Sequence, residues 1–572
     1  LISWSEHPDD AVKHFSGTAT YQGKVDLPQD ALGPNRRLTL DLGAVEVIAE
    51  VRVNGKDLGV LWKKPFAVDI TKAARPGANQ IEVRVTNLWW NRLVGDDKLP
   101  PAERATFTTA KSRLPRNRLL PSGLLGPVTV RVSEAREAAG DAPVPGPNLV
   151  FLLADDLGVM DLRCYGSRYY ETPNLDRLAA EGMRFSEAYA AGAVCSPTRA
   201  SILTGRYPAR LHLTAHIPGN EPPHARLRAP DWIKYLRDSE LTYAEAIREA
   251  GFVTFHAGKW HVDSEYDGKE SPRRHGFQYV VPGGNAKDPE DPHHVGKYTT
   301  AAEAFIEAHR GRQFLAVVSY NSVHVPLYEQ EERIAKYRDR PPGPNGQDNA
   351  VMAAMIERMD WSVGRILAKI DALGLRDRTA VVFSSDNGGL SRVSDERTRR
   401  SIVATSNLPY RGGKSQNYEG GIRVPLLVKW PGVTRPGSVS PVPVISTDLY
   451  PTFLDMLGLP PRAGQHLDGL SLAPILQGGD KLDRDNLFWH FPHYHTLPPH
   501  GAVRAGNWKL IEHYETGTAE LFDLAADPGE QTDLASVQPE RARALRDLFR
   551  AHRDAIGAQM PAPNPDHRPG VP

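Results

Sequence analysis

The stretch CSPTRASILTGR, residues 195–206, places a cysteine and an arginine where they could act together on an anion. Pro197 suits the first turn of a helix, and the residues after it continue with helical periodicity. Cys195 would then lie at a helix N-terminus, where unpaired N–H groups and the helix dipole favour negative charge. Arg199 would lie one turn on, on the same side. The stretch predicts a reactive group beside an anion site; the alternative is an inert, buried cysteine.

Polar side chains also follow four apolar runs of strand length. The runs are NLVFLLAD (148–155), GFVTFHAG (251–258), QFLAVVSY (313–320) and TAVVFSSD (379–386). The carboxyl ends of parallel strands meet at one edge of a sheet, and ligands bind there in open α/β folds. The residues that the runs deliver to this edge are Asp155, Asp156, Lys259, His261, His324, Asp386 and Asn387. One carboxylate after a strand is commonly a helix cap, but this number of reactive residues predicts a site.

The oxygens of Asp155, Asp156, Asp386 and Asn387 predict a site for a hard cation. Carboxylate and amide ligands without thiolates suit Ca²⁺ or Mg²⁺ rather than Zn²⁺. A cation would also relieve the repulsion between adjacent carboxylates in a partly buried site. The alternative is that Asp-Asn-Gly-Gly at 386–389 is only a turn.

Apolar runs alternate with helical patterns from residue 148 onward, with helices expected over 174–185, 243–250 and about 349–371. This alternation predicts an α/β fold whose mostly parallel sheet is covered by helices on both faces. Short runs rich in β-branched residues, separated by turns such as Asn54-Gly55, instead predict an N-terminal β-sandwich. The predicted domains are the sandwich at 1–133, a linker at 134–147, the α/β domain at 148–480, a smaller α+β subdomain at 481–558 and a disordered Pro-rich tail at 559–572.

Composition restricts the classes of partner. The chain has 69 basic and 69 acidic residues, whereas proteins that hold nucleic acid or anionic membranes normally have a basic excess. The two cysteines, Cys164 and Cys195, cannot form a disulfide framework, and we expect Cys164 to be packed. No apolar stretch reaches the roughly 18 residues of a membrane span. No signal peptide opens the chain, which we interpret as a fragment or a trimmed form of a longer protein.

Together the motifs resemble those of one enzyme family. CSPTR followed by LTGR is similar to the C-x-P-x-R signature of type I sulfatases, in the alkaline-phosphatase superfamily. The segments LADDLGVMDLRCYG, GKWH, HVP, SDNGG, RGGKSQNYEGGIRVPLLVKWPG and ELFDLAADPGEQTDLA resemble the other family blocks in order and kind. The resemblance runs from about residue 147 to 556. Thr198 is a small departure, because Ser or Ala is more frequent at that place in the motif.

The resemblance implies an alkaline-phosphatase-like fold and hydrolysis of sulfate esters. In this family a maturation enzyme oxidises the motif cysteine, here Cys195, to formylglycine. One hydroxyl of the hydrated aldehyde attacks sulfur, and the other later helps to eject sulfate. The resemblance also implies that the cation is Ca²⁺, held by Asp155, Asp156, Asp386 and Asn387.

The remaining catalytic roles are also implied by the resemblance. Arg199 would fix the hydrated aldehyde, while Lys259 and Lys414 would contact sulfate oxygens. His261 would bind the hydrate and act as the base in sulfate release. His324, with Lys414, would protonate the leaving oxygen.

Residues 1–133 resemble a different family, the galactose-binding-type β-sandwich near the end of rhamnosidase-like glycoside hydrolases. Trp62, Trp89 and Trp90 could stack on sugars there, but packing in a core or a domain interface is the favoured interpretation. The domain partnership implies a sulfated, rhamnose-containing polysaccharide of the ulvan type as substrate. We therefore expect a bacterial protein of the periplasm or the extracellular space. The exact polysaccharide, the sulfated hydroxyl, endo or exo action, oligomeric state and an upstream glycoside hydrolase domain stay open.

Other interpretations also stay open. The chain could be a phosphonate or phosphate ester hydrolase of the same superfamily, an aryl sulfatase without sugar preference, or a carbohydrate-binding protein with a decayed catalytic domain. A zinc site among His490, His493, His495 and His500 is conceivable, but the spacing matches no strong template. We expect His493 and His495 to contact substrate, with a proline-stiffened surface loop as the alternative.

Overall fold

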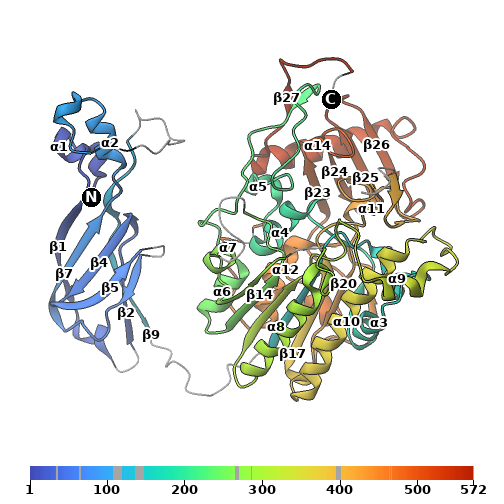
Figure 1. The fold of residues 1–572 in the computed structure, drawn as a ribbon, viewed down its shortest axis with the longest axis horizontal. Helices are drawn as coiled ribbons and strands as arrows, with labels where there is room; N and C mark the ends of the chain where they lie inside the picture. Colours follow the sequence, from blue (N-terminus) through green and yellow to red (C-terminus); the bar gives the residue numbers. More distant parts are fainter. Residues whose placement is uncertain are drawn as a thin grey trace. The chain divides into compact units, whose positions relative to one another are not determined.

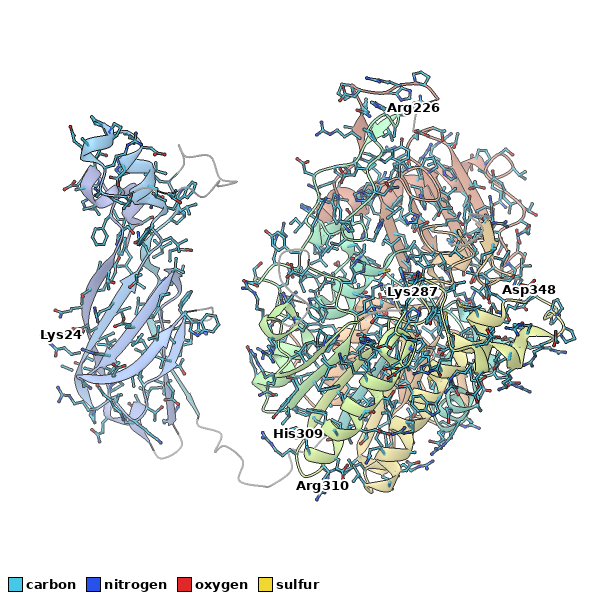
Figure 2. All side chains as sticks on the ribbon, in the orientation of Figure 1. Lys24, Arg226, Lys287, His309, Arg310 and Asp348 are labelled. Atoms are coloured by element: carbon cyan, nitrogen blue, oxygen red, sulfur yellow. The ribbon has the colours of Figure 1, made fainter. Side chains whose placement is uncertain are left out.

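The computed structural model describes residues 1–572 except 34–35, 63–65, 107, 109–118, 135–146, 264–269, 285–286, 395–400, 463, 466 and 571–572. The chain divides into two compact units, Leu1–Ala142 and Pro143–Pro572 (Figure 1). The side chains of both units are drawn in Figure 2. Almost all of the predicted linker at 134–147 lies outside the described residues.

The N-terminal unit consists of antiparallel sheets that share one hydrophobic core. One sheet has the order β1 (Thr18–Leu27), β7 (Gly77–Thr86), β4 (Ile48–Val53) and β5 (Lys56–Leu61). The others are β6 (Ala67–Asp69), β2 (Arg36–Asp41) and β9 (Thr129–Glu134), and the pair β3 (Ala44–Glu46) and β8 (Gly123–Gly126). Leu38 of β2 shares this core with Val51 of β4 and Val83 of β7, so side chains of two different sheets form it. A β-rich N-terminal unit is confirmed, and its relationship to galactose-binding modules stays a prediction.

Two of the three tryptophans do not pack in the core of this unit, whereas their packing in a domain interface stays a prediction. Trp62 and Trp89 are 66% and 69% exposed, so neither packs in the core of the unit. Trp90 begins the short helix α2 (Trp90–Asp96) and is half-buried. The two exposed rings lie just outside the strands β5 and β7, where the alternating pattern that buries one face of a strand no longer applies.

The larger unit is built on an eight-stranded sheet of order β15-β14-β16-β10-β17-β20-β11-β21. Its strands are β15 (Tyr279–Pro282), β14 (Val253–Gly258), β16 (Phe314–Ser319), β10 (Asn148–Ala154), β17 (Thr379–Ser385), β20 (Leu426–Lys429), β11 (Met183–Phe185) and β21 (Ser438–Ser440). The first five strands are mutually parallel. All seven residues of β10 are buried, because alternate side chains enter separate cores on the two faces of the sheet.

Helices cover both faces of this sheet, as the sequence predicts. One core includes side chains of α3 (Pro173–Glu181), α8 (Val295–Ala308) and α10 (Ala350–Ala372), and the other includes those of α4 (Cys195–Thr204), α6 (Tyr243–Glu249) and α12 (Leu449–Met456) (Figure 1). The side chain of Asn349 caps α10 by accepting hydrogen bonds from the amides of Val351 and Met352. The shorter helices are α5 (Pro208–Leu211), α7 (Glu270–Arg274), α9 (Glu331–Arg338), α11 (Glu419–Ile422) and α13 (Ala473–Leu476).

The C-terminal part of this unit is α+β. The strands β23 (Asn486–Phe491), β24 (His500–Ala505), β25 (Trp508–His513) and β26 (Ala519–Asp523) form an antiparallel sheet, and α14 (Pro539–Ile556) packs on it. None of the helices in the described ranges combines the length and apolarity needed to cross a membrane.

The prediction of a disordered tail at 559–572 is wrong for the part that the structure describes. β27 (Ala562–Pro563) pairs with β13 (Leu227–Arg228), and the Asn564 side chain donates to the carbonyls of Pro223 and Ala225 at 3.0 and 2.8 Å. The segment is ordered by hydrogen bonds to a loop more than 300 residues away in the chain. A Pro-rich composition without periodicity gives no sign of such contacts.

A buried charge cluster ties the C-terminal sheet to α11. Nζ of Lys509, on β25, lies 2.9 Å from Oε1 of Glu419 and 2.8 Å from Oε1 of Glu530, and all three side chains are fully buried. Burial alone would raise the pKa of Glu419, but neighbouring cations, Lys509 foremost, outweigh it and hold that pKa at about 2. Burial raises the pKa of Glu530 to about 7. Lys509 therefore compensates carboxyl groups from two separate segments.

Replacing Lys509 by methionine leaves these carboxyl groups buried without their nearest cation. We expect Lys509→Met to destabilise this unit by about 3–5 kcal/mol, the usual cost of breaking a buried ion pair on one side. Denaturant unfolding followed by tryptophan fluorescence measures the change. The exposed Lys481→Met is the matched control, with an expected effect within about 0.5 kcal/mol. A loss below about 1 kcal/mol for Lys509→Met would contradict the assignment.

Candidate active site

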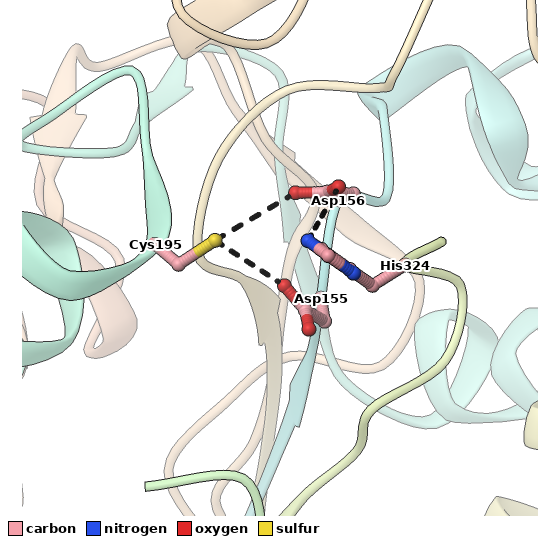
Figure 3. A group of neighbouring side chains, drawn as sticks. All are labelled: Asp155, Asp156, Cys195 and His324. Atoms are coloured by element: carbon pink, nitrogen blue, oxygen red, sulfur yellow. Dashed lines mark hydrogen bonds and ion pairs between the residues drawn. The ribbon is translucent and has the colours of Figure 1, made fainter. Parts of the chain in front are cut away.

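Cys195 lies at the N-terminus of α4, the position that the sequence predicts. Its side chain is 1% exposed, and Sγ lies 3.6 Å from Oδ1 of Asp155 and 3.9 Å from Oδ1 of Asp156 (Figure 3). Burial raises the pKa of the Cys195 thiol to about 12, although Lys259 and Lys414 act in the opposite direction. The thiol is therefore neutral near pH 7, and the site does not activate it as a thiolate nucleophile.

Two neighbouring strands bring the predicted cation ligands together. β10 and β17 are paired in parallel with Ala154 opposite Ser385, so Asp155 and Asp386 follow at the same edge. The amide of Asp156 donates to Oδ1 of Asp386 at 3.2 Å, and Nδ2 of Asn387 donates to Oδ1 of Asp156 at 2.9 Å. All four side chains are fully buried.

Each of the three carboxylates is paired with a different cation. Nζ of Lys259 donates to Oδ2 of Asp155 at 2.6 Å, and Nζ of Lys414 donates to Oδ2 of Asp156 at 2.8 Å. Nε of Arg199, one turn along α4 from Cys195, donates to Oδ2 of Asp386 at 2.7 Å.

The pKa shifts of the carboxylates differ. Burial alone would raise the pKa of Asp155, but Lys259 and three other cationic or histidine side chains hold it well below its usual range. Burial raises the pKa of Asp386 to about 6 even with Arg199 beside it, because Asp155 and Asp156 add their negative charge. The cations of the chain thus leave the negative charge at Asp386 incompletely compensated.

The residues present fit a hard divalent cation. Oδ1 of Asn387 is buried and has no hydrogen-bond partner among the described residues. A buried polar atom without a partner costs about 1–3 kcal/mol, and a cation would use this oxygen and compensate Asp386. Asp155, Asp156, Cys195 and His324 also offer ligand atoms that all lie within 4.8 Å of one another. Asp155, Asp156, Asp386 and Asn387 offer only oxygen ligands, and such a set suits Ca²⁺ or Mg²⁺.

The two predicted catalytic histidines each have one ring nitrogen fixed by a backbone carbonyl. Nε2 of His261 lies 2.7 Å from the carbonyl of Ile217, and burial with Lys259 nearby lowers the His261 pKa to about 3. Nδ1 of His261 is buried and has no partner in the described part of the chain, so it offers a free lone pair. Nδ1 of His324 lies 2.7 Å from the carbonyl of Val325, and Nε2 lies 3.7 Å from Oδ2 of Asp156. Burial lowers the pKa of His324 although both aspartates raise it.

The structure buries His493, which the sequence predicts to contact substrate. His493 is 2% exposed, its Nε2 lies 2.8 Å from Oγ1 of Thr214, and its ring packs on Trp232. Almost no surface is left for a substrate, so the expectation for His493 is corrected to a packing role. The ring of His495 is exposed and packs edge-on against His216 with centroids 5.3 Å apart. His495 is therefore still able to contact a ligand.

The other two histidines of this segment have structural partners. The ring nitrogens of His490 contact the Tyr514 hydroxyl and the Gln559 carbonyl, and those of His500 contact the Pro498 carbonyl and the Asn417 amide. No group of metal-ligating side chains within the described ranges includes these histidines. Cys164 is half-buried, and burial raises its pKa to about 12.

A cavity of about 530 Å³ opens from the catalytic residues and adds residues that sequence reasoning missed. Its lining includes Asp155, Lys259, His261 and His324, and also Asp263, Asn321 and the Gly283–Gly284 pair. Asp263 has a signal in the sequence, because Lys259, His261 and Asp263 alternate with the buried Trp260 and Val262. His216, which packs against His495 and does not line this cavity, follows no periodic pattern, so its position cannot be predicted from the sequence.

Comparison with known proteins identifies the family. The model of the sulfatase family matches residues 147–459, and that of the N-sulphoglucosamine sulphohydrolase C-terminal region matches residues 413–551. This chain belongs to the sulfatase family. It is 32% identical to human arylsulfatase A, over 73% of this chain and 90% of that protein. It is 27% identical to N-acetylgalactosamine-6-O-sulfatase of Bacteroides thetaiotaomicron, over 70% of this chain and 92% of that protein.

The fold agrees with this assignment. The crystal structure of Ps i-CgsB in complex with k-i-k-neocarrahexaose matches with a TM-score of 0.60 and 24% identity, over 71% of this chain and 93% of that one. The sulfatase therefore has the expected alkaline-phosphatase-like α/β fold. Its family model and its relatives identify it as a sulfuric ester hydrolase. The family assignment also speaks against a non-catalytic carbohydrate-binding protein.

Cation binding by this sulfatase can be tested without measuring catalytic turnover. Ca²⁺ at roughly 100 times its dissociation constant should stabilise the protein by about 2.7 kcal/mol, because it binds only the folded site. We expect the melting temperature to rise on addition of Ca²⁺ and to fall back with a chelator. In Asn387→Leu, which lacks the unpartnered oxygen, the rise should shrink or vanish. The exposed Asn220→Leu is the matched control. An equal rise in Asn387→Leu would show that Ca²⁺ binds elsewhere.

Proposed function

We propose that this sulfatase removes sulfate from a carbohydrate and that Cys195 acts after conversion to formylglycine by a maturation enzyme. The observation that carries the proposal is the state of Cys195. It lies at a helix N-terminus, faces two aspartates and has Lys259 and Lys414 as the strongest charges acting on it, yet its thiol stays protonated. A site with this charge distribution is suited to an anionic ester, whereas the neutral thiol is a poor nucleophile. When present, the hydrated aldehyde supplies an oxygen nucleophile in place of the sulfur.

The surroundings of Cys195 support this role. Arg199 is held by Asp386 through Nε and by the carbonyl of Lys259 through Nη1, at 2.7 and 2.9 Å. Its Nη2 is buried and makes no hydrogen bond to any described residue. A hydroxyl carried by residue 195 is a suitable acceptor for this donor. Lys259 and Lys414, each anchored on an aspartate, supply positive charge for the oxygens of the sulfate group.

In this proposal His261 accepts a proton and His324 donates one. His261 donates from Nε2 to the Ile217 carbonyl and keeps Nδ1 as an acceptor, which suits a base that takes a proton from a hydroxyl. His324 presents Nε2 beside Asp156, and a bound sulfate ester adds negative charge that favours its protonated form. We propose that His324, with Lys414, donates a proton to the leaving oxygen.

We propose Ca²⁺ as the metal, held by Asp155, Asp156, Asp386 and Asn387. When bound, it supplies positive charge beside residue 195 and beside a sulfate oxygen. The fully buried oxygen ligands and the unpartnered Oδ1 of Asn387 support this assignment.

The substrate class rests on the relatives and on the N-terminal unit. One curated relative is an N-acetylgalactosamine-6-O-sulfatase, which acts on a sulfated sugar. The N-terminal unit resembles modules of rhamnosidase-like hydrolases, and Trp62 and Trp89 expose large aromatic surfaces suited to sugar rings. We therefore propose a sulfated, rhamnose-containing polysaccharide of the ulvan type, met in the periplasm or outside a bacterial cell.

Sulfate release from size-defined ulvan oligosaccharides tests this function. The protein is produced together with a formylglycine-generating enzyme, and peptide mass confirms conversion of Cys195. We expect release that falls by on the order of 10⁴-fold or more in Cys195→Ala, since the nucleophile is lost. If converted protein cleaves aryl sulfates but no ulvan oligosaccharide, the proposed substrate is rejected and the proposed sulfatase chemistry is retained. Faster turnover of aryl phosphonate than of aryl sulfate esters would favour the phosphonate hydrolase alternative.

The proposed role of His324 predicts a dependence on the leaving group. A sugar alkoxide needs a proton as it leaves, whereas 4-nitrophenolate is a stable anion. His324→Ala should therefore slow sugar sulfates by about 10²–10⁴-fold and slow 4-nitrophenyl sulfate much less. Steady-state kinetics on both esters measures the difference, with His7→Ala in the N-terminal unit as the matched control. Equal losses on both esters would contradict a proton-donor role.

A further inference from the structure

The loop of residues 212–228 follows α5 and ends with β13, and its first half reaches the active site. The carbonyl of Ile217 accepts from Nε2 of His261 at 2.7 Å, and the amide of Ile217 donates to Oγ of Ser196 at 3.1 Å. Ser196 follows Cys195 in the first turn of α4. One residue of this segment, which we call the Ile217 loop, therefore contacts both the predicted base and the turn that carries the reacting residue.

The outer half of the Ile217 loop is not held by packing. Residues 218–228 are all described, and none of them is buried. In the inner half, Ile217 and Ala215 pack with Trp232 in a small cluster apart from the cores of the sheet. The course of the outer half therefore depends on hydrogen bonds that reach it from other segments.

The C-terminal segment 557–568 supplies hydrogen bonds at both ends of the Ile217 loop. The carbonyl of Gly557 accepts from Nε2 of His212 at 3.1 Å, at the start of the loop. At the far end β27 pairs with β13, and Nδ2 of Asn564 donates to two loop carbonyls at 3.0 and 2.8 Å (Figure 1). We call this segment the C-terminal strap, because it joins both ends of the loop.

Asn564 joins the C-terminal strap to the loop through its side chain and its backbone. Its amide donates to the carbonyl of Arg226 at 3.1 Å, in addition to the two bonds from Nδ2. Its Oδ1 accepts from the amide of Asp566 at 3.1 Å, so both ends of the carboxamide are fixed. His567 continues the contact, since its Nδ1 lies 3.0 Å from the carbonyl of His224.

We propose that the C-terminal strap positions His261 through the Ile217 loop and that Asn564 is the positioning residue. A fixed Ile217 carbonyl keeps the proton of His261 on Nε2, which leaves Nδ1 as the acceptor. Where the loop loosens, the ring loses the partner that sets this tautomer, and water gains access to it. Asn564 itself touches no reacting group. The catalytic consequence rests on the proposed function, in which His261 is the base.

The test uses the full-length protein with Asn564→Asp and Asn564→Ala. Aspartate has nearly the shape of asparagine but no side-chain donor, and it places a carboxylate against two carbonyl oxygens. The exposed Asn220→Ala, in the same loop, is the matched control. Melting temperatures within about 2 °C of the wild type establish that the variants are folded.

The first readout needs no turnover and uses unconverted protein. Hydrogen exchange followed by mass spectrometry reports on the backbone amides of the Ile217 loop and on the ring C2 proton of His261. We expect both Asn564 variants to exchange the loop amides about tenfold faster, because hydrogen bonds that oppose local opening are lost. Burial lowers the pKa of His261 to about 3, so entry of water should raise that pKa and speed exchange at C2 by about threefold or more.

The second readout is steady-state hydrolysis of 4-nitrophenyl sulfate by converted protein. We expect kcat to fall by about 5–50-fold in the Asn564 variants, because the base is misplaced. KM should fall by a similar factor, so that kcat/KM stays within about threefold of the wild type. The reason is the order of the steps: kcat/KM reports the steps through departure of 4-nitrophenolate, whereas the base acts later, in sulfate release. Asn220→Ala should leave kcat and KM unchanged.

Unchanged exchange in both Asn564 variants would overturn the inference, because the strap would then not hold the loop. Faster loop exchange with wild-type kcat, or a fall in kcat with KM unchanged, would also overturn it, since the loop would then not position His261 for its step. Equal changes in Asn220→Ala would do the same, because they would show a general effect of altering the loop. Converted wild-type protein that hydrolyses no sulfate ester is a different outcome. It rejects the proposed function, while exchange at His261 still decides whether the strap positions this ring.

Discussion

The site depends on three ion pairs whose aspartates are fully buried and whose cations are at most 10% exposed. Lys259 with Asp155, Lys414 with Asp156 and Arg199 with Asp386 are joined at 2.6, 2.8 and 2.7 Å. Buried ion pairs contribute little net stability, because the cost of removing both charges from water offsets their attraction. Their value here is positional. Each aspartate fixes one cation near Cys195, so the charges that the proposed function assigns to an anionic ester are already in place before it binds.

The fold explains how these charges can be buried side by side. β10 and β17 are central strands with both faces covered, and their register places Asp155 and Asp386 at one edge. The cations come from other segments: Lys259 follows β14, Arg199 lies in α4, and Lys414 lies in the loop between β19 (Ser401–Val403) and α11. Each side chain is thus held by a different part of the α/β core. A change in the packing of any one of them alters the charge balance of the whole site.

The sequence was sufficient where the site follows a strong pattern. The buried strands are continuous apolar runs, so their ends and the polar residues just beyond them could be located, and α4 began at Cys195 as the proline suggested. Asp263 was missed because its alternation with Trp260 and Val262 is short and its significance depends on Ser271, eight residues away. His216 meets His495 across 279 positions of the chain, and no local pattern encodes such a contact. The burial of His493 and the ordered tail were misjudged for the same reason: both depend on partners distant in sequence.

One carboxylate of the site, Asp386, is not fully compensated by the cations of the chain. Three carboxylates face three cations, yet the pKa of Asp386 is raised to about 6, since Arg199 does not overcome burial and the two neighbouring aspartates together. The oxygen of Asn387 next to it in sequence has no partner among the described residues. A divalent cation held there would give the Asn387 oxygen a partner and would offset the carboxylate charge at Asp386. Such a cation would add to the positive charge that Lys259, Lys414 and Arg199 already hold at the site.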